Sequence, residues 1–324
     1  MPYCHLVFTL PHELNALAAF HPRWVYDTLM HETAATPSEF AANPRWLGGT
    51  GAFTLVLHTW TQDLRRHLHV HALMACGALK MDSGIDDTTT TTRTASWVTP
   101  TRSERFLFPV HALSCVFRAK FLAALHAAEA AGDLPRDPAD ASARQARTQA
   151  LRRHAWVVYA KTPLAGPAAV LDYLSRYTHR TAIGNERLVG MEGDVVRLRV
   201  RADDHGGKRV ISLPGQEFIG RLLQHVLPSG FKRIRHYGLL APCAKTKRLA
   251  QARLLLAMPA ANAQAQEDAE AFMKRVGQIE INTCAHCQGR LRVVEQRAAD
   301  VSMLRALLAW SEAARYEAPC RGPP

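Results

Sequence analysis

The sequence predicts an α+β fold built on an antiparallel sheet, and three observations carry that prediction. Residues 52–60 and 67–75 are apolar, strand-like runs separated by a short polar turn, which is the pattern of an antiparallel hairpin. Apolar residues recur at three- and four-residue spacing over residues 13–33 and again after Pro109, as on the buried stripe of a helix. Further strand-like runs after Gly184 predict small β/α and helical C-terminal additions.

The first elements follow from local patterns. Residues 3–10 read as a buried strand that Pro11 ends, and a helix is predicted from about Glu13 to Thr33. Residues 34–50 are rich in Pro, Gly and Ala and predict a connection. The hairpin follows, and its polar tip carries Gln62, Asp63, Arg65 and Arg66.

The middle of the chain alternates irregular and regular segments. Residues 77–101, with threonines at 88–92, predict a flexible surface excursion, and Pro109 opens a helix of about 20 residues. Residues 131–150 are rich in Ala, Arg and Asp and predict a mobile basic connection. A strand at 156–160 and a helix carrying Tyr173 and Tyr177 come next.

Smaller elements complete the chain. Strands are predicted at 195–201 and 208–213, with helices at 215–227, 245–278 and 298–315 and a short strand at 290–295. The expected division is a first domain over residues 1–190, a small β/α subdomain over 191–244 and a helical C-terminal region over 245–324.

Composition favours a polyanionic partner. The chain of 324 residues carries 40 Lys and Arg against 28 Asp and Glu, a net charge of +12, so nucleic acid is the first candidate and a merely basic soluble protein the alternative. No run approaches the length of a membrane span, and the first residues lack the basic region of a signal peptide. The 7 scattered cysteines fit a reducing cytoplasm better than a disulfide framework.

The stretch around which the chain is organised is the histidine strand at 67–71. His67, His69 and His71 alternate with Leu68 and Val70, so the three imidazoles should share one face while the aliphatic residues anchor the other in a core. Neutral imidazoles two residues apart can share one divalent metal. The alternative is an incidental pair of histidines in a strand.

A pair of phenols is the second candidate feature. Tyr173 and Tyr177 lie four residues apart on one predicted helix face, surrounded by Arg176, His179 and Arg180. A phenol becomes a nucleophile toward phosphorus when a base, a cation or a metal assists it, and a second phenol permits a second cleavage while the first end stays attached. The alternative is ordinary helix packing.

Together these motifs resemble the two-tyrosine HUH transposases of rolling-circle insertion sequences, relatives of the Helitron and rolling-circle replication enzymes. The resemblance covers most of the chain and rests on residues 8–14, 67–71, 173–180, 185–188 and 233–240. It implies a palm-like (ferredoxin/RRM-like) antiparallel sheet, cleavage of single-stranded DNA, a covalent bond between tyrosine and the DNA 5′ end, and Mg²⁺ or Mn²⁺. By position, His69 and His71 match the metal pair, and Tyr173 and Tyr177 match the nucleophiles.

Members of that family usually add a third polar metal ligand. Gln62, at the end of the partner strand of the hairpin, is the candidate here, with Asp63 as the runner-up. His67 is expected to touch DNA or to support the site from outside. The chain departs from the family pattern because it begins at the first strand, without the usual N-terminal zinc-binding segment, and reads Met74-Ala-Cys-Gly-Ala78 where a Pro and a Gly-rich turn are usual.

Two further segments are candidates for binding. The segment 231–237 combines four basic residues, Lys232, Arg233, Arg235 and His236, with the aromatic Phe231 and Tyr237. Cations of such a segment can follow phosphates while aromatic rings stack on bases. Further candidate DNA contacts are Arg176 and Arg180. Cys284 and Cys287 form half of a zinc site; a relic of such a site or two free thiols is the preferred alternative.

The sequence therefore predicts a transposase that cleaves and rejoins single-stranded DNA in the bacterial cytoplasm, in association with the nucleoid. Three alternatives stay open: a replication initiator or relaxase-like nickase, a catalytically inactive DNA-binding remnant, and, more distantly, a metalloprotein acting on small phosphodiesters.

Overall fold

A computed structural model describes most of the chain. The described residues are 2–83, 93–100, 107–161 apart from 136 and 138, 170, 182–202 and 207–258, followed by 267–277, 280, 282–284, 286–292 and 294. The chain divides into a main unit, which holds the residues up to Met258, and a second unit over residues 259–307.

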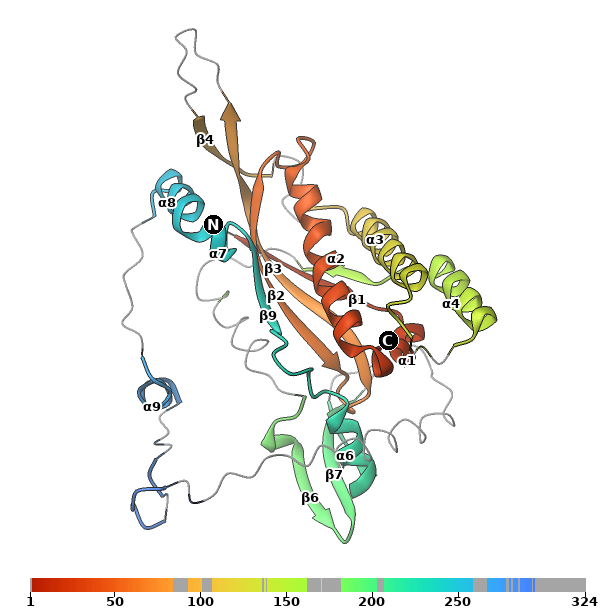
Figure 1. The fold of residues 1–324 in the computed structure, drawn as a ribbon. Helices are drawn as coiled ribbons and strands as arrows, with labels where there is room; N and C mark the ends of the chain where they lie inside the picture. Colours follow the sequence, from red (N-terminus) through yellow and green to blue (C-terminus); the bar gives the residue numbers. More distant parts are fainter. Residues whose placement is uncertain are drawn as a thin grey trace. The chain divides into compact units, whose positions relative to one another are not determined.

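The centre of the main unit is a large antiparallel sheet (Figure 1). Its strands follow the order β5-β1-β3-β2-β9, and β4 pairs with the far end of β3. The bounds are β1 (Tyr3–Thr9), β2 (Thr50–Trp60), β3 (Arg66–Ser83), β4 (Arg93–Val98), β5 (Val158–Ala160) and β9 (Ile234–Gly238). This arrangement confirms the predicted α+β class and the hairpin of β2 and β3.

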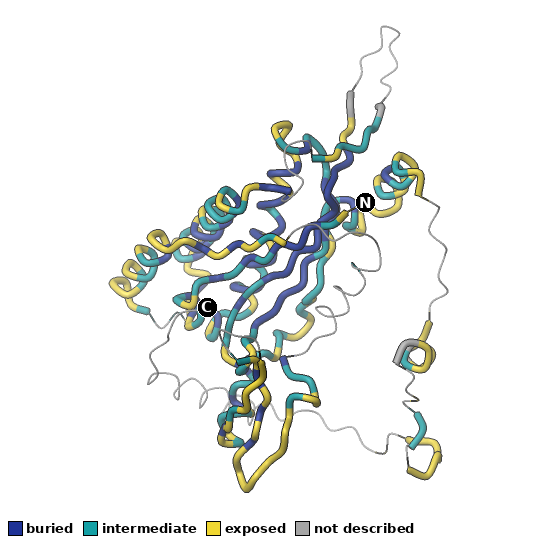
Figure 2. Tube along the Cα trace, turned by 180° about the vertical axis from the view of Figure 1, so that it is seen from behind, coloured by how far each residue is buried: buried dark blue, intermediate teal, exposed yellow. Residues whose placement is uncertain are grey.

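Helices cover one face of this sheet and form the core with it. The short α1 (Asn15–Phe20) leads into α2 (Pro22–Ala42), and α3 (Val110–Ala131) lies beside α2. Phe8, Leu57 and Val70 point from three strands into a core that also contains Tyr26 of α2 and Phe117 of α3. In Figure 2 the strands of the large sheet are mostly buried, and the helices have exposed outer faces.

Two predicted connections are helical instead. The Pro/Gly/Ala-rich stretch at 34–50 was expected to be a connection, but α2 continues to Ala42 and includes Pro37, because Phe40 and Ala41 on its buried side stay in contact with the core. Residues 131–150 contain α4 (Ala141–Arg153), which the Asp140 side chain caps by accepting a 2.7 Å hydrogen bond from the Ala143 amide. Tertiary burial overrides the weak local signal at both places.

The excursion predicted over residues 77–101 is also partly regular. β3 runs on to Ser83 and pairs with β4, so that Leu79 lies opposite Trp97. The indole of Trp97 packs over Gly77, where a β-carbon would lie 2.6 Å from the ring. Small residues on β3 therefore leave room for this aromatic contact. The threonines at 88–92 lie outside the described residues.

A second, three-stranded sheet contains β6 (Leu188–Glu192), β7 (Val195–Arg201) and β8 (Lys208–Pro214), followed by α6 (Gly215–Leu223). The strands predicted at 195–201 and 208–213 are confirmed, and β6 was missed. Leu198 and Val200 of β7 pack with Leu64 of the β2–β3 turn and with Phe218 of α6. The small sheet is thereby anchored on the tip of the hairpin.

The long C-terminal helix predicted over 245–278 is broken. α7 (Pro242–Ala244) continues through a π-helical turn into α8 (Ala250–Leu255), and the chain then leaves the helix at Ala257, whose φ is +51°. In the second unit, α9 (Ala269–Phe272) continues through a π-helical turn to Gly277. The described part of 290–295 shows a single bridge from Arg290 to Thr283 instead of a strand, and 298–315 lies outside the described residues.

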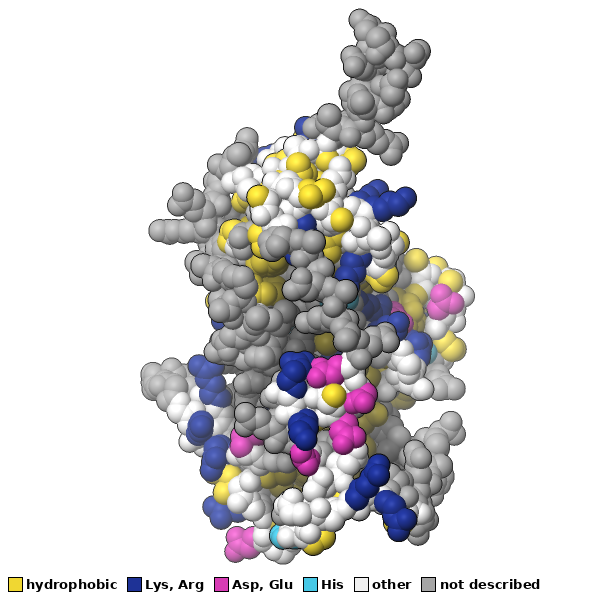
Figure 3. All heavy atoms as spheres, turned by 90° about the vertical axis from the view of Figure 1, so that its left-hand side faces the viewer, with side chains coloured by type: hydrophobic (Ala, Val, Ile, Leu, Met, Phe, Trp, Pro, Cys, Tyr) yellow, Lys and Arg dark blue, Asp and Glu magenta, His cyan; other side chains and the backbone are white. Residues whose placement is uncertain are grey.

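Two surface properties bear on function. Among the described helices, none is long and apolar enough to cross a membrane. Lys and Arg side chains are exposed at many separate places on the face drawn in Figure 3, in keeping with the net charge of +12. The three-part domain division expected from the sequence stays a prediction.

Candidate metal centre

Three histidines from two neighbouring strands meet on the face of the large sheet opposite the helix-covered core. The side chains of His58, His69 and His71 offer ligand nitrogens that all lie within 4.8 Å of one another. β2 and β3 pair so that His58 stands directly opposite His69, with Val56 opposite His71. This group could therefore hold one metal ion.

Strand alternation explains why these side chains share a face. Leu68 and Val70 of β3 are buried in the core beneath the helices. His69 and His71, one residue along in each case, must then point to the opposite side of the sheet. His58 is directly opposite His69 and therefore shares that side.

A fourth histidine, from the other neighbouring strand, contacts the cluster. His5 of β1 places its Nε2 3.0 Å from Nδ1 of His71, and the two rings stack with centroids 5.2 Å apart. His69 is held in a similar way, because its Nδ1 lies 3.1 Å from the backbone oxygen of His67. When both Nδ1 atoms carry the proton and donate it in these bonds, His69 and His71 keep unprotonated Nε2 atoms as metal ligands.

The electrostatics of the cluster favour neutral rings. Burial, together with the nearby His67 and His58, lowers the pKa of His69 to about 3. Burial likewise lowers the pKa of His5 to about 3 and that of His71 further still. Metal ligands must be deprotonated, so the three-imidazole donor set fits a divalent transition metal at neutral pH.

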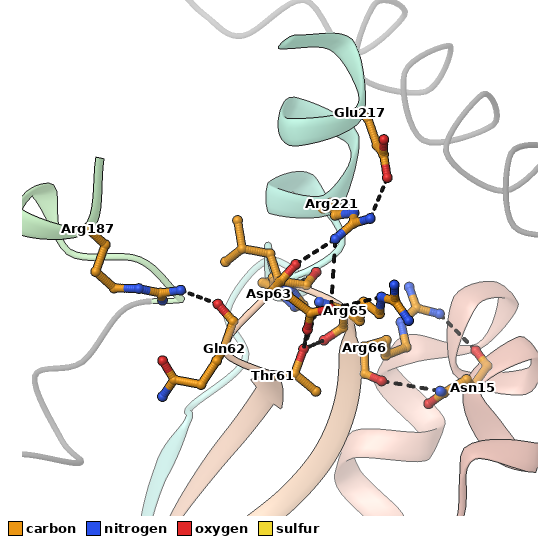
Figure 4. A network of polar contacts seen from close by, with 11 residues as sticks. Asn15, Thr61, Gln62, Asp63, Arg65, Arg66, Arg187, Glu217 and Arg221 are labelled. Atoms are coloured by element: carbon orange, nitrogen blue, oxygen red, sulfur yellow. Dashed lines mark hydrogen bonds and ion pairs between the residues drawn. The ribbon is translucent and has the colours of Figure 1, made fainter. Parts of the chain in front are cut away.

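The sequence-predicted third ligand lies elsewhere. Gln62 is exposed on the turn beyond β2, and its backbone oxygen accepts a hydrogen bond from Arg187 (Figure 4). The runner-up, Asp63, accepts from the Thr61 hydroxyl and forms an ion pair with Arg65 at 2.9 Å. The structure brings His58, rather than either turn residue, to the histidine pair.

The turn that carries Gln62 and Asp63 contacts the small second sheet. Leu64 adopts a left-handed φ of +63°, and its side chain is fully buried against the small sheet. The Asp63 and Leu64 carbonyls accept hydrogen bonds from Arg221 at 2.8 Å and from His225 at 3.0 Å. The polar tip thus docks the second sheet, which a reading of the hairpin alone does not show.

His67 lies at the margin of the cluster. Its ring centroid is 4.9 Å from that of His69, and burial lowers its pKa. It supplies the backbone oxygen that holds His69. Its expected contact with DNA stays a prediction.

The basic residues of the segment at 231–237 form two groups: exposed residues and residues that make contacts within the protein. Lys232 and His236 are exposed, and His236 also shares a 2.9 Å hydrogen bond with Thr54. Arg233 and Arg235 make contacts within the protein: Arg233 lies over the Trp60 ring at 5.9 Å, and Arg235 forms an ion pair with Asp27 of α2.

The aromatic residues of this segment were expected to stack on bases; the structure shows both rings packed within the protein, and their stacking on bases stays a prediction. Phe231 packs edge-on against Tyr26, with ring centroids 5.8 Å apart. Tyr237 stacks on Phe53 at 5.5 Å. Both rings pack against the main core. For Tyr237 the reason is that β9 pairs with β2, which places Tyr237 opposite the buried Phe53.

Two groups of predicted residues remain untested. Tyr173, Arg176, Tyr177 and Arg180 lie outside the described residues. In the second unit, the backbone amide of Cys284 donates to Gly289, and hydrogen bonds from the backbone of Cys287 and His286 lower the pKa of the Cys284 thiol. Within the part of the chain that the structure describes, the His, Cys, Asp and Glu group suited to a metal is the one around His69.

Sequence reasoning missed His58 and His5, although each is a histidine inside an otherwise apolar strand. A polar residue at such a position is a usable signal, since burying an imidazole without a partner is unfavourable. Knowing the strand order was needed to connect them to His69 and His71.

The comparisons with known proteins agree on one class. Residues 51–248 match a family described as "Putative transposase". The chain is 38% identical over 304 residues to the putative transposase y4qJ of Sinorhizobium fredii (strain NBRC 101917 / NGR234), covering 90% of this chain and 73% of that protein. It is 26% identical over 245 residues to the transposase for insertion sequence element IS801 of Pseudomonas savastanoi pv. phaseolicola, covering 74% of this chain and 54% of that protein. No solved structure matches the chain.

Proposed function

Because the chain belongs to the family described as "Putative transposase", we propose that it is a rolling-circle transposase of the two-tyrosine HUH type, which cleaves and rejoins single-stranded DNA. The observation that carries the proposal is the cluster of His58, His69 and His71 on the face of an antiparallel sheet opposite the helix-covered core. It is supported by the Tyr173 and Tyr177 pair in the sequence. We also propose that the large sheet is the palm-like sheet that the resemblance to this family implies.

The donor set bears on the choice of metal. Imidazole nitrogens suit transition metals, whereas Mg²⁺ prefers carboxylate and water oxygens, so three histidines favour Mn²⁺ over Mg²⁺. When bound there, the metal would withdraw charge from a DNA phosphate and orient it for attack. His58, His69 and His71 would hold it, while His5 and the His67 carbonyl fix the ring orientations.

In the proposed reaction the nucleophile comes from the chain itself. The phenol oxygen of Tyr173 or Tyr177 forms a bond to phosphorus, and the bond between phosphorus and the 3′ oxygen breaks. The phenol proton is lost and the departing 3′ oxygen gains one, which leaves a 5′-phosphotyrosine and a free 3′ hydroxyl. The phosphodiester energy is retained, so a hydroxyl can later rejoin the strand. The second tyrosine can act while the first end is still attached.

Covalent capture tests the proposal directly. We expect labelled single-stranded DNA carrying the element ends to form a Mn²⁺-dependent adduct with the protein on a denaturing gel. The adduct should be lost in the variant with both Tyr173→Phe and Tyr177→Phe, because no phenol remains to attack. Each single change should impair the complete cleavage and rejoining reaction.

The matched control is Tyr159→Phe, which removes a half-exposed phenol from β5 and should leave the adduct in place. An adduct that persists in the double variant would refute the assignment of the tyrosines. Wild-type protein that forms none, on DNA containing the native ends, would instead indicate the inactive DNA-binding remnant.

The contact between His5 and His71 gives a separate expectation. His5→Leu removes the hydrogen-bond partner of His71 and should weaken Mn²⁺ binding about 10- to 100-fold, as loss of an orienting group usually does. His5→Gln, which keeps an acceptor, should recover part of the affinity. Isothermal titration with Mn²⁺ measures both variants.

Thr9→Val is the control, since Thr9 lies on the same face of β1, opposite His69. Unchanged Mn²⁺ affinity in folded His5→Leu protein would show that His5 only fills space beside the cluster.

A further inference from the structure

One face of the small sheet carries a row of cationic side chains. Along β7 the residues Val196, Leu198 and Val200 are buried, and the alternating Arg197, Arg199 and Arg201 are exposed. The neighbours on β8 that share the exposed face are Ser212, Val210 and Lys208, in the order of those arginines. We call Arg197, Arg199, Arg201 and Lys208 the arginine face.

These cations lack acidic partners within the described part of the chain. The ion pairs found there do not include any residue of the arginine face; they engage other arginines, such as Arg147 with Asp137 and Arg221 with Glu217. Arg199 donates to the backbone oxygen of Glu186 at 3.3 Å, which leaves its charge uncompensated. The face is therefore complementary to an anion.

The spacing fits an extended polyanion. Alternate residues of a strand lie about 6.6 Å apart, so the three arginines form a line about 13 Å long. Guanidinium groups bind phosphates through paired hydrogen bonds. A line of such groups can follow a phosphate backbone.

The side chains of the arginine face favour duplex DNA over single-stranded DNA as the partner. Proteins that hold single strands usually offer aromatic rings on which bases stack. The described neighbours of these arginines on the same face are Val210 and Ser212 of β8 and Gly190 and Glu192 of β6, and none of them is aromatic. The face is suited to phosphate contacts alone, which carry no sequence information.

We propose that the arginine face binds the phosphate backbone of duplex DNA next to the site of cleavage, without sequence preference. This inference rests on the proposed function, but it assigns a second partner and a second surface. The small sheet is anchored to the β2–β3 turn by Leu64 and by the bond from Arg221 to Asp63. β2 and β3 also carry the histidine cluster, so a duplex bound here would be held beside the catalytic strands.

Salt-dependent binding tests the proposal. The variant with Arg197, Arg199 and Arg201 all changed to Gln is compared with the wild type by fluorescence anisotropy, using a labelled duplex of arbitrary sequence and labelled oligo-dT. Duplex affinity should fall about 10- to 100-fold at low salt, and the slope of log K against log salt should shrink by about 0.9 for each phosphate that the protein no longer neutralises. The affinity for oligo-dT should change far less.

The control removes the same charge elsewhere. Arg45, Arg152 and Arg153 are exposed residues of the main unit outside the small sheet, and changing all three to Gln should leave duplex affinity close to the wild-type value. Equal losses in both triple variants would mean that net charge alone explains binding and would overturn the proposal. Unchanged duplex affinity, or an equal loss for oligo-dT, would overturn it as well.

Wild-type adduct formation separates the two proposals. If the wild type forms the adduct but the triple arginine variant binds duplex DNA as the wild type does, the inference about the arginine face is refuted and the proposed function stands. A specific duplex effect without any adduct would leave the arginine face in place and count against the tyrosine nuclease.

Discussion

Changing His69 and His71 together to alanine is expected to abolish metal-dependent adduct formation while the fold is retained. Both imidazoles lie on the face of β3 opposite the helix-covered core, and Leu68 and Val70 still anchor the strand. Metal assistance is worth several kcal/mol in the transition state, so the rate should fall by about 10³-fold or more. Adduct yield over time with Mn²⁺ measures the loss, and circular dichroism checks the fold.

The matching control changes His12 and His31 to alanine, since both side chains are largely exposed. A double variant of His69 and His71 that still forms the adduct would place the metal elsewhere. One that fails to fold would give the cluster a structural role.

Isothermal titration with Mn²⁺ decides between His58 and Gln62 as the third ligand. His58→Ala should lower Mn²⁺ affinity strongly, because it removes one of three nitrogens within 4.8 Å of one another. Gln62→Ala should leave that affinity unchanged, since the hydrogen bond that Gln62 makes to Arg187 uses its backbone oxygen. The reverse result would restore the third ligand that the sequence alone suggested.

Gly238→Ala is expected to destabilise the protein by about 3 to 5 kcal/mol. Gly238 has a φ of +61°, and a β-carbon there would lie 1.9 Å from the backbone oxygen of Gly51. That oxygen accepts the 2.9 Å hydrogen bond from Leu239 where β9 ends against β2. The substitution therefore combines backbone strain with a clash that the ladder cannot relieve. Urea denaturation measures the free energy of unfolding.

Gly193→Ala separates the cost of backbone strain from the cost of the clash with Gly51. Gly193 also has a positive φ, of +57°, but a β-carbon there would have no neighbour within 4 Å. It should cost about 1 kcal/mol, the usual penalty of the left-handed region. Similar losses at both glycines would show that conformational strain, and not the contact with Gly51, limits position 238.

The hairpin and α3 were predictable because their signals are local. Alternation over residues 67–71 and the apolar stripe of α3 depend only on the periods of a strand and a helix. The same reasoning failed for residues 34–42 and 141–150, where α2 and α4 form. Those segments are helical because Phe40 and Leu151 reach a core assembled from distant parts of the chain.

The residues of the candidate site also fall into those that the sequence predicts and those that only the tertiary structure brings together. Sequence alone determined that His69 and His71 share a face, that the chain carries a tyrosine pair, and that these motifs resemble a transposase family. Only the tertiary structure decided that His58 and His5 join the histidines and that the tip of the hairpin docks a second sheet. Side-chain direction within a strand is fixed by its own period, whereas cross-strand neighbours depend on strand order and register, which contacts far apart in the sequence set.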